Sequence, residues 1–372
     1  MQVSWSQVHA WRLRRQLVDP RGSADAVDVV ARLCGVQAQV ASAAELAVTL
    51  RQAEPGVGQV QRALADGTLV KTWAMRGTLH LLAPAQAACF LSLIGSARVW
   101  EKGAWQRAFG ATPRQVETLV EVVSQILTDT VLTRDELVRR IVEHPELAGM
   151  EDSLRAGWAA VLKPLAWQGA LCHGPSQGSR VTFTRPSSAL SGWTGIPEPE
   201  DAAPVAIAAY LGAYGPSTPE IFDAWLSRNA LRKADVRRWF ADLGDRLVEV
   251  DVGDRSAFLL AEHADDLAGT SETASVRLLG AFDQYVLGPG TKDQHLLAPE
   301  HRALISRAAG WISPIVVVGG RITGVWELID DTVSVSFLPG AAGVSEQDLE
   351  AELAHLRWAT GQADLRLRLA TV

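Results

Sequence analysis

The sequence has few cysteines and few tyrosines, and it lacks any long hydrophobic segment. Its three cysteines, Cys34, Cys89 and Cys172, form neither a CxxC pair nor a disulfide framework, which is typical of a reducing cytoplasm. The longest apolar runs, such as residues 205–211, fall far short of the roughly 18–20 residues that a membrane span needs. The N-terminus, MQVSWSQVHAWRLRR, has no apolar core of a secretory signal. We therefore expect a cytoplasmic protein that does not act at a membrane.

Basic residues are also in deficit. Lysine and arginine number 35 against 42 aspartates and glutamates, which gives a formal net charge of −7. This balance argues against a chain that coats nucleic acid indiscriminately, but it is compatible with a local basic groove. The 372 residues are 48% hydrophobic and 21% charged, as in ordinary folded chains. At about 100–200 residues per domain, the length allows a few domains or one repeat assembly.

One pattern, two helices followed by a two-stranded hairpin, recurs three times along the chain. Its clearest copy runs from GPSTPEIFDAWL through LRKADVRRWFADL to RLVEVDV and SAFLLAE, with a turn at Gly253. A second copy opens at VLTRDELVRRIVEH, where Thr133 and Glu136 form a capping box. It continues as a helix through DSLRAGWAAVLKPLAWQG and ends in strands at ALCHGP and RVTFTRP. The first copy predicts a helix over SADAVDVVARLCGVQAQ, another ending at Gly67, and strands at LVKTWAM and TLHLLAP.

This order of elements is the winged-helix pattern, and the tail of the chain differs from it. From about residue 275, we expect strands over RLLGAFDQYVLGP, ISPIVVVGGRITGVWEL and VSVSFLP, with a tight hairpin at Gly319 and Gly320. A closing helix follows with Ser345 as its cap. The fold class is therefore α+β, with tandem winged-helix repeats and a C-terminal β-rich unit. The expected segments are winged helices at 1–85, 86–186 and 205–270, a Ser-, Gly- and Pro-rich linker at 187–204, and the β-rich unit at 271–372.

The cations best placed for nucleic acid lie in the third repeat. They are Arg228, Arg232, Lys233, Arg237 and Arg238, with Asp235 as the lone acid among them. Five cations near the second helix of a winged helix could neutralise several DNA phosphates. A solvated helix face would look the same, because charge runs are weak signals. The cluster Arg12, Arg14 and Arg15 is a second candidate, for which a solvated role is the more natural interpretation.

A short motif, Gln37-Ala38-Gln39, connects the chain to a known family. It lies within LCGVQAQVASAAELAVTLR and is accompanied by KTWAMRGTLHLL at 71–82, AFDQYVLGP at 281–289 and VVVGGRITGVWE at 316–327. Together these segments resemble the AlkZ-type DNA glycosylases, a superfamily of tandem winged-helix proteins that excise alkylated bases. The catalytic signature of that family is Gln, a small apolar residue, then Gln or Asp. Gln at the third position resembles the subgroup tied to self-resistance in producers of azinomycin, a bifunctional DNA alkylator.

The resemblance implies a glycosylase that acts on duplex DNA containing N7-alkylated purines, azinomycin-type interstrand crosslinks included. Gln37 and Gln39 would hold the attacking water, since each amide offers one acceptor and one donor group. A base alkylated at N7 leaves as a neutral molecule, so the enzyme needs mainly to position water and stabilise charge. The segment has no Lys or Asp that would form a covalent intermediate, which implies a monofunctional enzyme. On a single helix the two glutamines would diverge by about 200°, so we expect a bend, an unwound stretch or a turn.

Several other residues have two interpretations. Arg76, at the tip of the first hairpin, and Arg321, beside Gly319, could contact DNA or could be solvated. From the residues alone, two surface amides are the favoured interpretation of Gln37 and Gln39, and the family resemblance reverses that preference.

The remaining candidates are expected to be structural. We expect His80, Trp73 and Trp326 to pack in the core and Glu45 to be a solvated helix residue. Three histidines, His173, His263 and His295, lack the spacing of metal ligands. We therefore predict no metal and no cofactor. Three modules in one chain can replace a dimer, so we expect a monomer. Two alternative functions remain open: a winged-helix transcriptional regulator and an inactive scaffold in a repair complex.

Overall fold

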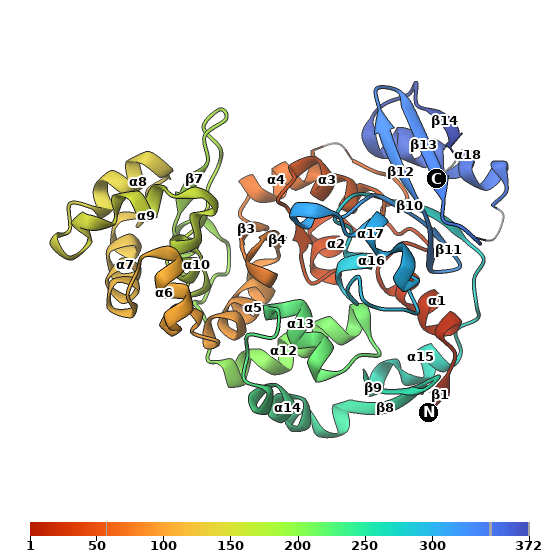
Figure 1. The fold of residues 1–372 in the computed structure, drawn as a ribbon, viewed down its shortest axis with the longest axis horizontal. Helices are drawn as coiled ribbons and strands as arrows, with labels where there is room; N and C mark the ends of the chain where they lie inside the picture. Colours follow the sequence, from red (N-terminus) through yellow and green to blue (C-terminus); the bar gives the residue numbers. More distant parts are fainter. Residues whose placement is uncertain (57, 342–343, 371–372) are drawn as a thin grey trace. The chain divides into compact units, whose positions relative to one another are not determined.

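The computed structural model describes residues 1–56, 58–341 and 344–370. The chain divides into two compact units, each assembled from stretches that are far apart in sequence (Figure 1). Unit 1 comprises Met1–Val60, Ala208–Trp225 and Leu243–Val372, and unit 2 comprises Gln61–Ile207 and Leu226–Asp242. In the described part of the chain, no helix combines the length and the apolar character that crossing a bilayer requires.

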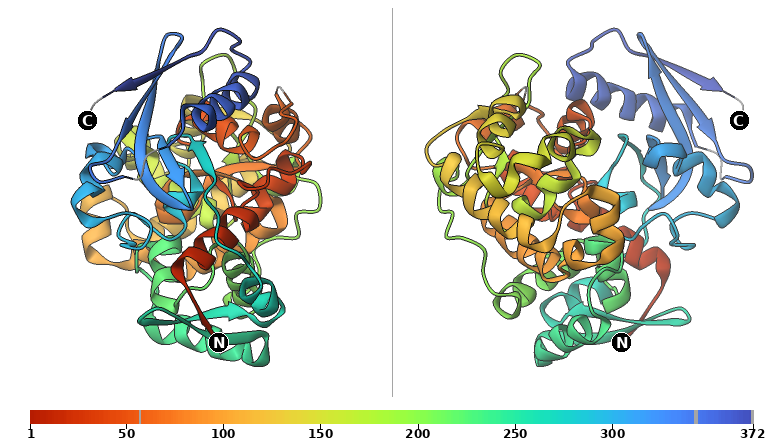
Figure 2. Two further views of the ribbon diagram at one scale, coloured as in Figure 1. Left: turned by 90° about the vertical axis from the view of Figure 1, so that its right-hand side faces the viewer. Right: turned by 60° about the vertical axis from the view of Figure 1, so that its left-hand side comes forward.

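Unit 1 contains a five-stranded sheet with strand order β10-β11-β12-β13-β14. The pairs from β10 to β13 are antiparallel, whereas β13 and β14 are parallel. Helix α18 (Glu346–Thr360) buries Leu349, Leu353 and Leu356 against one face of this sheet (Figure 2). The strands are β10 (Val276–Leu279), β11 (Ile315–Val318), β12 (Arg321–Ile329), β13 (Thr332–Phe337) and β14 (Arg366–Ala370).

Local signals in this tail are confirmed at three points. Gly319 and Gly320 have φ of +56° and +82°, so both central residues of the hairpin adopt the left-handed region that favours glycine. Ser345 caps α18 by accepting a hydrogen bond from the backbone N–H of Asp348 at 3.1 Å. Strands form at 315–318, 321–329 and 332–337 as expected.

One expectation for the tail was wrong. The segment RLLGAFDQYVLGP is a strand only at β10, and Gln284–Leu287 forms a short helix, α16. The side chain of Asp283 accepts a hydrogen bond from the backbone N–H of Tyr285 at 2.8 Å and so caps this helix. The cap redirects the chain immediately after Phe282, whose φ is +58°.

The N-terminal part of unit 1 packs on a second sheet. Strand β1 (Gln2–Val3) pairs in parallel with β8 (Leu247–Val252), which forms an antiparallel hairpin with β9 (Arg255–Leu260). Val8 and Trp11 of α1 (Trp5–Arg15) pack against this hairpin in a shared hydrophobic cluster. The other elements near the N-terminus are α2 (Ala26–Arg32), β2 (Val36–Gln37) and α3 (Ala41–Thr49).

Unit 2 is built on strands in the order β4-β3-β6-β7-β5, with helices packed around them. The sharp turn between β3 (Val70–Trp73) and β4 (Leu79–Leu82) contains Arg76 and Gly77, both with positive φ. Helix α10 contacts α5, α7 and β3 and so joins the helices to the sheet. Other elements are β5 (Leu132–Thr133), β6 (Cys172–His173), β7 (Thr182–Thr184), α4 (Gln59–Ala65), α5 (Pro84–Ser96), α6 (Gly103–Phe109), α7 (Pro113–Ile126), α8 (Arg134–Ile141), α10 (Lys163–Trp167), α11 (Pro186–Ala189) and α14 (Lys233–Asp242).

The second repeat lies wholly in unit 2 and shows both a confirmed and a corrected expectation. Thr133 and Glu136 form the predicted capping box at the start of α8. The single helix expected over DSLRAGWAAVLKPLAWQG is instead divided into α9 (Glu151–Arg155), a 3-10 segment (Gly157–Leu162) and α10. Ala156, with ψ of 148°, interrupts the helical path after α9.

The mixed helix-and-sheet class is confirmed, and the order of two helices followed by a hairpin is present in the third stretch as α13 (Pro219–Ser227), α14, β8 and β9. Naming these stretches winged helices remains a prediction, as do the segment boundaries. Helix α12 (Pro199–Tyr214) begins inside the expected linker at 187–204, because Glu200 and Asp201 favour a helix start at its N-terminal end.

Candidate active site and nucleic-acid interface

The motif Gln37-Ala38-Gln39 does not lie on a helix. The helix expected over residues 23–39 ends at Arg32, and Cys34 and Gly35 then adopt φ of +55° and +101°. Only glycine adopts a φ such as that of Gly35 readily, so this residue reverses the chain into β2. Strand β2 ends at Gln37, and Gln39 lies two residues further on, in a bend of the chain. The departure from the helix that the motif needed is therefore supplied by residues before it.

The two glutamines differ in exposure. Gln37 is only 7% exposed, whereas Gln39 is exposed, and Val36 and Ala38 beside them are buried. Among the described residues, neither side-chain amide has a hydrogen-bond partner, yet the polar atoms of Gln37 are not sealed from solvent. Two amides that are not engaged by the protein are free to bind water through their donor and acceptor groups.

Buried polar contacts of unit 1 hold this segment on both sides. Tyr214, fully buried, donates its hydroxyl to the carbonyl oxygen of Leu33 at 2.5 Å, at the end of α2. Beyond the motif, Arg51 follows α3 and forms a fully buried bidentate ion pair with Asp283, with N–O distances of 2.7 and 2.9 Å. Arg51 also donates to the carbonyl oxygens of Gln16 and Ala47.

These supporting residues were missed by the sequence reasoning. Asp283 stands within the apolar stretch AFDQYVL, and an acid in such a stretch signals a buried partner. Gly288, in the same motif, is needed because a Cβ there would come within 2.2 Å of the Tyr214 ring. The motif AFDQYVLGP thus supports the segment that carries Gln37.

Glu45 departs from its expected role as a solvated residue. It lies on α3 between the buried Ala44 and Ala47, and both of its carboxylate oxygens are shielded from solvent. The expectation failed because most of the α3 residues around Glu45 are buried, among them Ala43, Ala44 and Ala47.

His80, Trp73 and Trp326 are buried, as expected. The ring Nδ1 of His80 lies 3.0 Å from the carbonyl oxygen of Thr78. Burial, and secondarily the charge of Arg76, lower the pKa of His80 to about 3, although the contact with Thr78 acts in the opposite direction. His80 is therefore neutral at physiological pH and cannot act as a cationic group there.

The predicted DNA-binding cations fall into two groups by their surroundings. Arg228 and Arg76 line one pocket of unit 2, and Arg232, Lys233 and Arg237 are exposed on or beside α14. Arg238 instead lies among carboxylates, 2.8 Å from Glu200, 3.6 Å from Asp235 and 3.9 Å from Asp242. Its charge is compensated within the protein, which makes it the least suitable of the five for binding phosphate.

Arg321, in unit 1, is exposed at the start of β12. The turn before it is closely packed, because a Cβ on Gly320 would lie 2.4 Å from the Cβ of His9. Tyr285 also donates its hydroxyl to the carbonyl oxygen of Gly320 at 2.5 Å. A rigid turn therefore presents Arg321 to solvent.

The cations of the cluster Arg12, Arg14 and Arg15 are all engaged within the protein, although Arg14 stays partly exposed. Arg12 is 4% exposed and donates to the carbonyl oxygens of Gly215 and Pro216. Arg14 pairs with Asp266 at 2.6 Å, and Arg15 donates to the carbonyl oxygen of Gly212. Arg12 and Arg15 thus satisfy carbonyl oxygens at and just beyond the C-terminal end of α12 within unit 1. In the described parts of the chain, no cluster of three or more His, Cys, Asp or Glu residues is arranged to hold a metal ion.

The chain is similar to known proteins over its whole length. The family model described as "DNA glycosylase AlkZ-like" matches residues 30–358. A protein of Streptomyces sahachiroi, described as an interstrand DNA cross-link repair glycosylase, is 55% identical over 370 residues, which is 99% of this chain and 100% of the relative. The solved structure of the Streptomyces sahachiroi DNA glycosylase AlkZ superposes with a TM-score of 0.98 at 55% identity, covering 100% of both chains.

Proposed function

The chain belongs to the AlkZ-like DNA glycosylase family, and from this premise we propose that it hydrolyses the N-glycosidic bond of purines alkylated at N7 in duplex DNA. The observation that carries the proposal is the pair of amides on Gln37 and Gln39. They lie two residues apart on a non-helical segment, and among the described residues neither side-chain amide is engaged in a hydrogen bond.

Hydrolysis of this bond needs little general acid or base catalysis. A purine alkylated at N7 carries a positive charge and departs as a neutral base, which leaves positive charge on the sugar in the transition state. The amides of Gln37 and Gln39 would orient one water toward the anomeric carbon and stabilise that charge through their carbonyl oxygens. An amide is a poor general base, so the contribution we assign to it is positioning. The segment offers no lysine for a Schiff base, which supports a monofunctional reaction.

We further propose that crosslinked purines are substrates. A base tied to the opposite strand cannot be rotated out of the duplex, so a pocket that requires base flipping would exclude it. The exposure of the Gln39 side chain supports a site that duplex DNA reaches without extrusion of the base. The name of the Streptomyces sahachiroi relative, a cross-link repair glycosylase, supports the same substrate class.

Sequence-independent contacts to phosphate would be made by exposed cations together with the half-buried Arg76. We assign this role to Arg76, Arg228, Arg232, Lys233, Arg237 and Arg321, with Arg238 contributing least. Three repeats in one chain provide binding elements that a dimeric regulator takes from two copies, so we propose that the protein acts as a monomer on chromosomal DNA in the cytoplasm.

The test of the reaction is product analysis. When the protein is incubated with a duplex that contains N7-methylguanine, we expect release of the free base and formation of an alkali-labile abasic site. Borohydride should trap no covalent protein–DNA adduct, because no amine attacks the sugar. Release of the base without an abasic product, or efficient trapping, would contradict the mechanism.

The contrast between Arg228 and Arg238 gives a second prediction. Arg228 has no ion pair with a described residue, whereas Arg238 lies 2.8 Å from Glu200. We expect Arg228→Met to weaken duplex binding and to reduce the slope of log K against log salt by about 0.9, the value for one phosphate contact on B-DNA. Arg238→Met, the matched control on the same segment, should change the slope much less. Fluorescence anisotropy over a salt series measures both, and equal slopes for the two variants would contradict the assignment of Arg228.

A further inference from the structure

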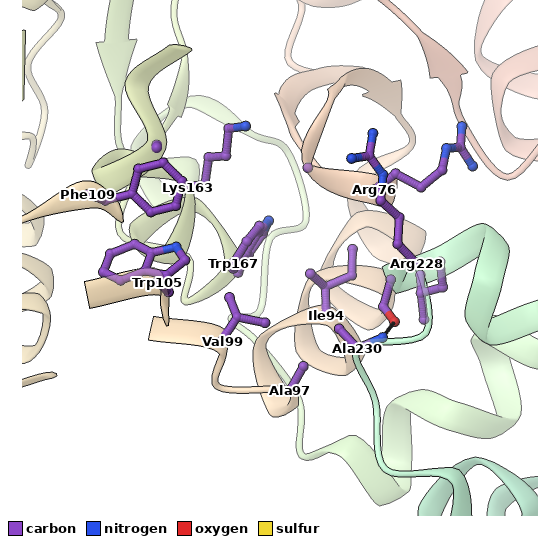
Figure 3. Close-up of a pocket in the computed structure, with 14 residues that line it drawn as sticks. Arg76, Ile94, Ala97, Val99, Trp105, Phe109, Lys163, Trp167, Arg228 and Ala230 are labelled. Carbon is purple, nitrogen blue, oxygen red and sulfur yellow. Dashed lines mark hydrogen bonds between the residues drawn. The ribbon is translucent and has the colours of Figure 1, made fainter. Parts of the chain in front are cut away.

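Unit 2 contains a pocket of about 310 Å³ that the proposed excision chemistry does not use. It is formed at α5, α6, α10 and the residues that follow α13, all of them within unit 2. Figure 3 shows Trp105, Phe109 and Lys163 on one side, Arg76 and Arg228 on the other, and Trp167 between them. Its size lies at the lower end of the range of small-molecule sites, roughly 300–1,000 Å³.

The charge of this pocket has one sign. Arg76, Lys163 and Arg228 line it, and the lining residues that the structure describes include no aspartate or glutamate. Burial lowers the pKa of Lys163, and the nearby charge of Arg228 lowers it further. Among the described residues, neither Lys163 nor Arg228 has a carboxylate partner. Like charges held together in a partly desolvated pocket repel one another, so an anion that enters it is attracted by all of them.

Two of these cations stand at unusual backbone positions. Arg76 and Arg228 have φ of +57° and +61°, and Asn229 next to Arg228 has φ of +61°. Residues other than glycine adopt this region at a cost, and such positions cluster at binding sites.

The opposite wall is aromatic. Trp105 and Phe109 meet edge to face with ring centroids 5.2 Å apart, and Phe109 is 38% exposed although it is strongly apolar. Trp167 is 7% exposed, and its indole N–H is sealed from solvent without a hydrogen-bond partner among the described residues. The indole of Trp167 therefore adds a largely buried apolar ring beside the two more exposed ones.

We propose that this pocket binds one unpaired nucleotide of a DNA strand, with the base against Trp105 and Phe109 and the phosphate between Lys163, Arg228 and Arg76. One aromatic wall and one cationic wall together suit a ligand that has a flat aromatic group and an anionic group. Proteins that bind single strands hold them in this way, by stacking bases on aromatic side chains beside cations. The proposal rests on the proposed function only in taking DNA as the ligand, and it does not depend on the excision reaction.

The experiment compares two labelled probes by fluorescence anisotropy, an oligothymidylate and a blunt duplex. We expect Trp105→Ala to raise the Kd for the oligothymidylate by about 5- to 140-fold, the range for removal of one stacking residue. Trp105→Phe should restore most of the affinity because it retains an aromatic face. Lys163→Met should lower the salt slope for the oligothymidylate by about 0.7, the value for one phosphate of a single strand. The matched control is Trp311→Ala, which removes a 41% exposed tryptophan outside the pocket.

The outcomes separate this proposal from its alternatives. Should Trp105→Ala fold poorly, Phe109→Ala removes a more exposed ring from the same wall, and it is expected to weaken oligothymidylate binding in the same direction. An unchanged Kd in Phe109→Ala and Lys163→Met, or an equal loss for oligothymidylate and duplex, would overturn the proposal. If the protein released no base from alkylated DNA, the proposed function would fail, while the anisotropy ratio would still decide whether the pocket binds an unpaired nucleotide.

Discussion

Replacing Gln37 with alanine is expected to lower the rate constant for excision of N7-methylguanine by about 10²- to 10³-fold, the usual cost of removing one preorganised group that acts on the transition state. The affinity for the duplex should remain nearly unchanged, because the cations that we assign to phosphate binding are untouched. Gln37 is 7% exposed and its amide is not engaged by any described residue, so its removal breaks no internal hydrogen bond. Single-turnover kinetics with saturating protein separate the chemical step from binding.

Gln39 and a control glutamine make this experiment specific. Gln39→Ala should also slow excision, and the double variant should be less impaired than the product of the two single effects, because both amides act on one water. Gln347→Ala, on the exposed face of α18, should leave the rate unchanged. Wild-type rates in both Gln37→Ala and Gln39→Ala would remove these residues from the mechanism.

The second large effect concerns stability and the ion pair between Arg51 and Asp283. Asp283→Ala should lower the free energy of unfolding by about 3–5 kcal/mol, because it leaves the guanidinium of Arg51 buried without a counter-ion. Both side chains are fully buried, and Asp283 in addition caps α16 through the backbone N–H of Tyr285. Urea denaturation followed by far-UV circular dichroism measures the change.

Two further variants distinguish the buried charge from the loss of a carboxylate alone. Asp331 pairs with Arg366 at 3.6 Å, with both side chains largely exposed, and Asp331→Ala should cost less than about 1 kcal/mol. The double variant Arg51→Met with Asp283→Leu should recover much of the stability lost in Asp283→Ala, because it leaves no unpaired charge inside. Equal destabilisation by Asp283→Ala and Asp331→Ala would show that burial of the Arg51–Asp283 pair does not increase the free-energy cost of losing the carboxylate.

The features that the sequence predicted well are those encoded within a few residues. Thr133 and Glu136 lie three apart and form their capping box, and Ser345 caps α18. The hairpin at Gly319 and Gly320 likewise depends on two adjacent residues whose φ only glycine adopts readily. Such signals need no knowledge of the rest of the fold.

The conformation of the candidate site could not be predicted in the same way. The apolar pattern of residues 23–39 is compatible with a helix, but the chain leaves the helix after Arg32 and the carbonyl oxygen of Leu33 accepts a hydrogen bond from Tyr214, 181 residues away. A contact over that separation has no local signature. Periodicity therefore predicted a helix where tertiary contacts accompany a turn and a two-residue strand.

Buried charges were missed for a similar reason. Arg12 was interpreted as a surface cation, yet its guanidinium binds the carbonyl oxygens of Gly215 and Pro216, 203 and 204 residues away. Lys163 is an isolated lysine in an apolar stretch and has no sequence signature of a site. Only the fold places it in a pocket with Arg76 and Arg228. The sequence shows that a cation is present, whereas the fold determines which acceptor groups bind it.

The division of unit 1 into separated stretches has a consequence for biosynthesis. Arg51 leaves the ribosome 232 residues before Asp283, which at about 5–20 residues per second is a delay of roughly 12–46 s. Unit 2 is fully translated at Asp242, whereas unit 1 lacks the whole β10–β14 sheet at that moment. The nascent chain therefore carries its glutamine motif without the scaffold that shapes it, and the enzyme becomes competent only near the end of translation.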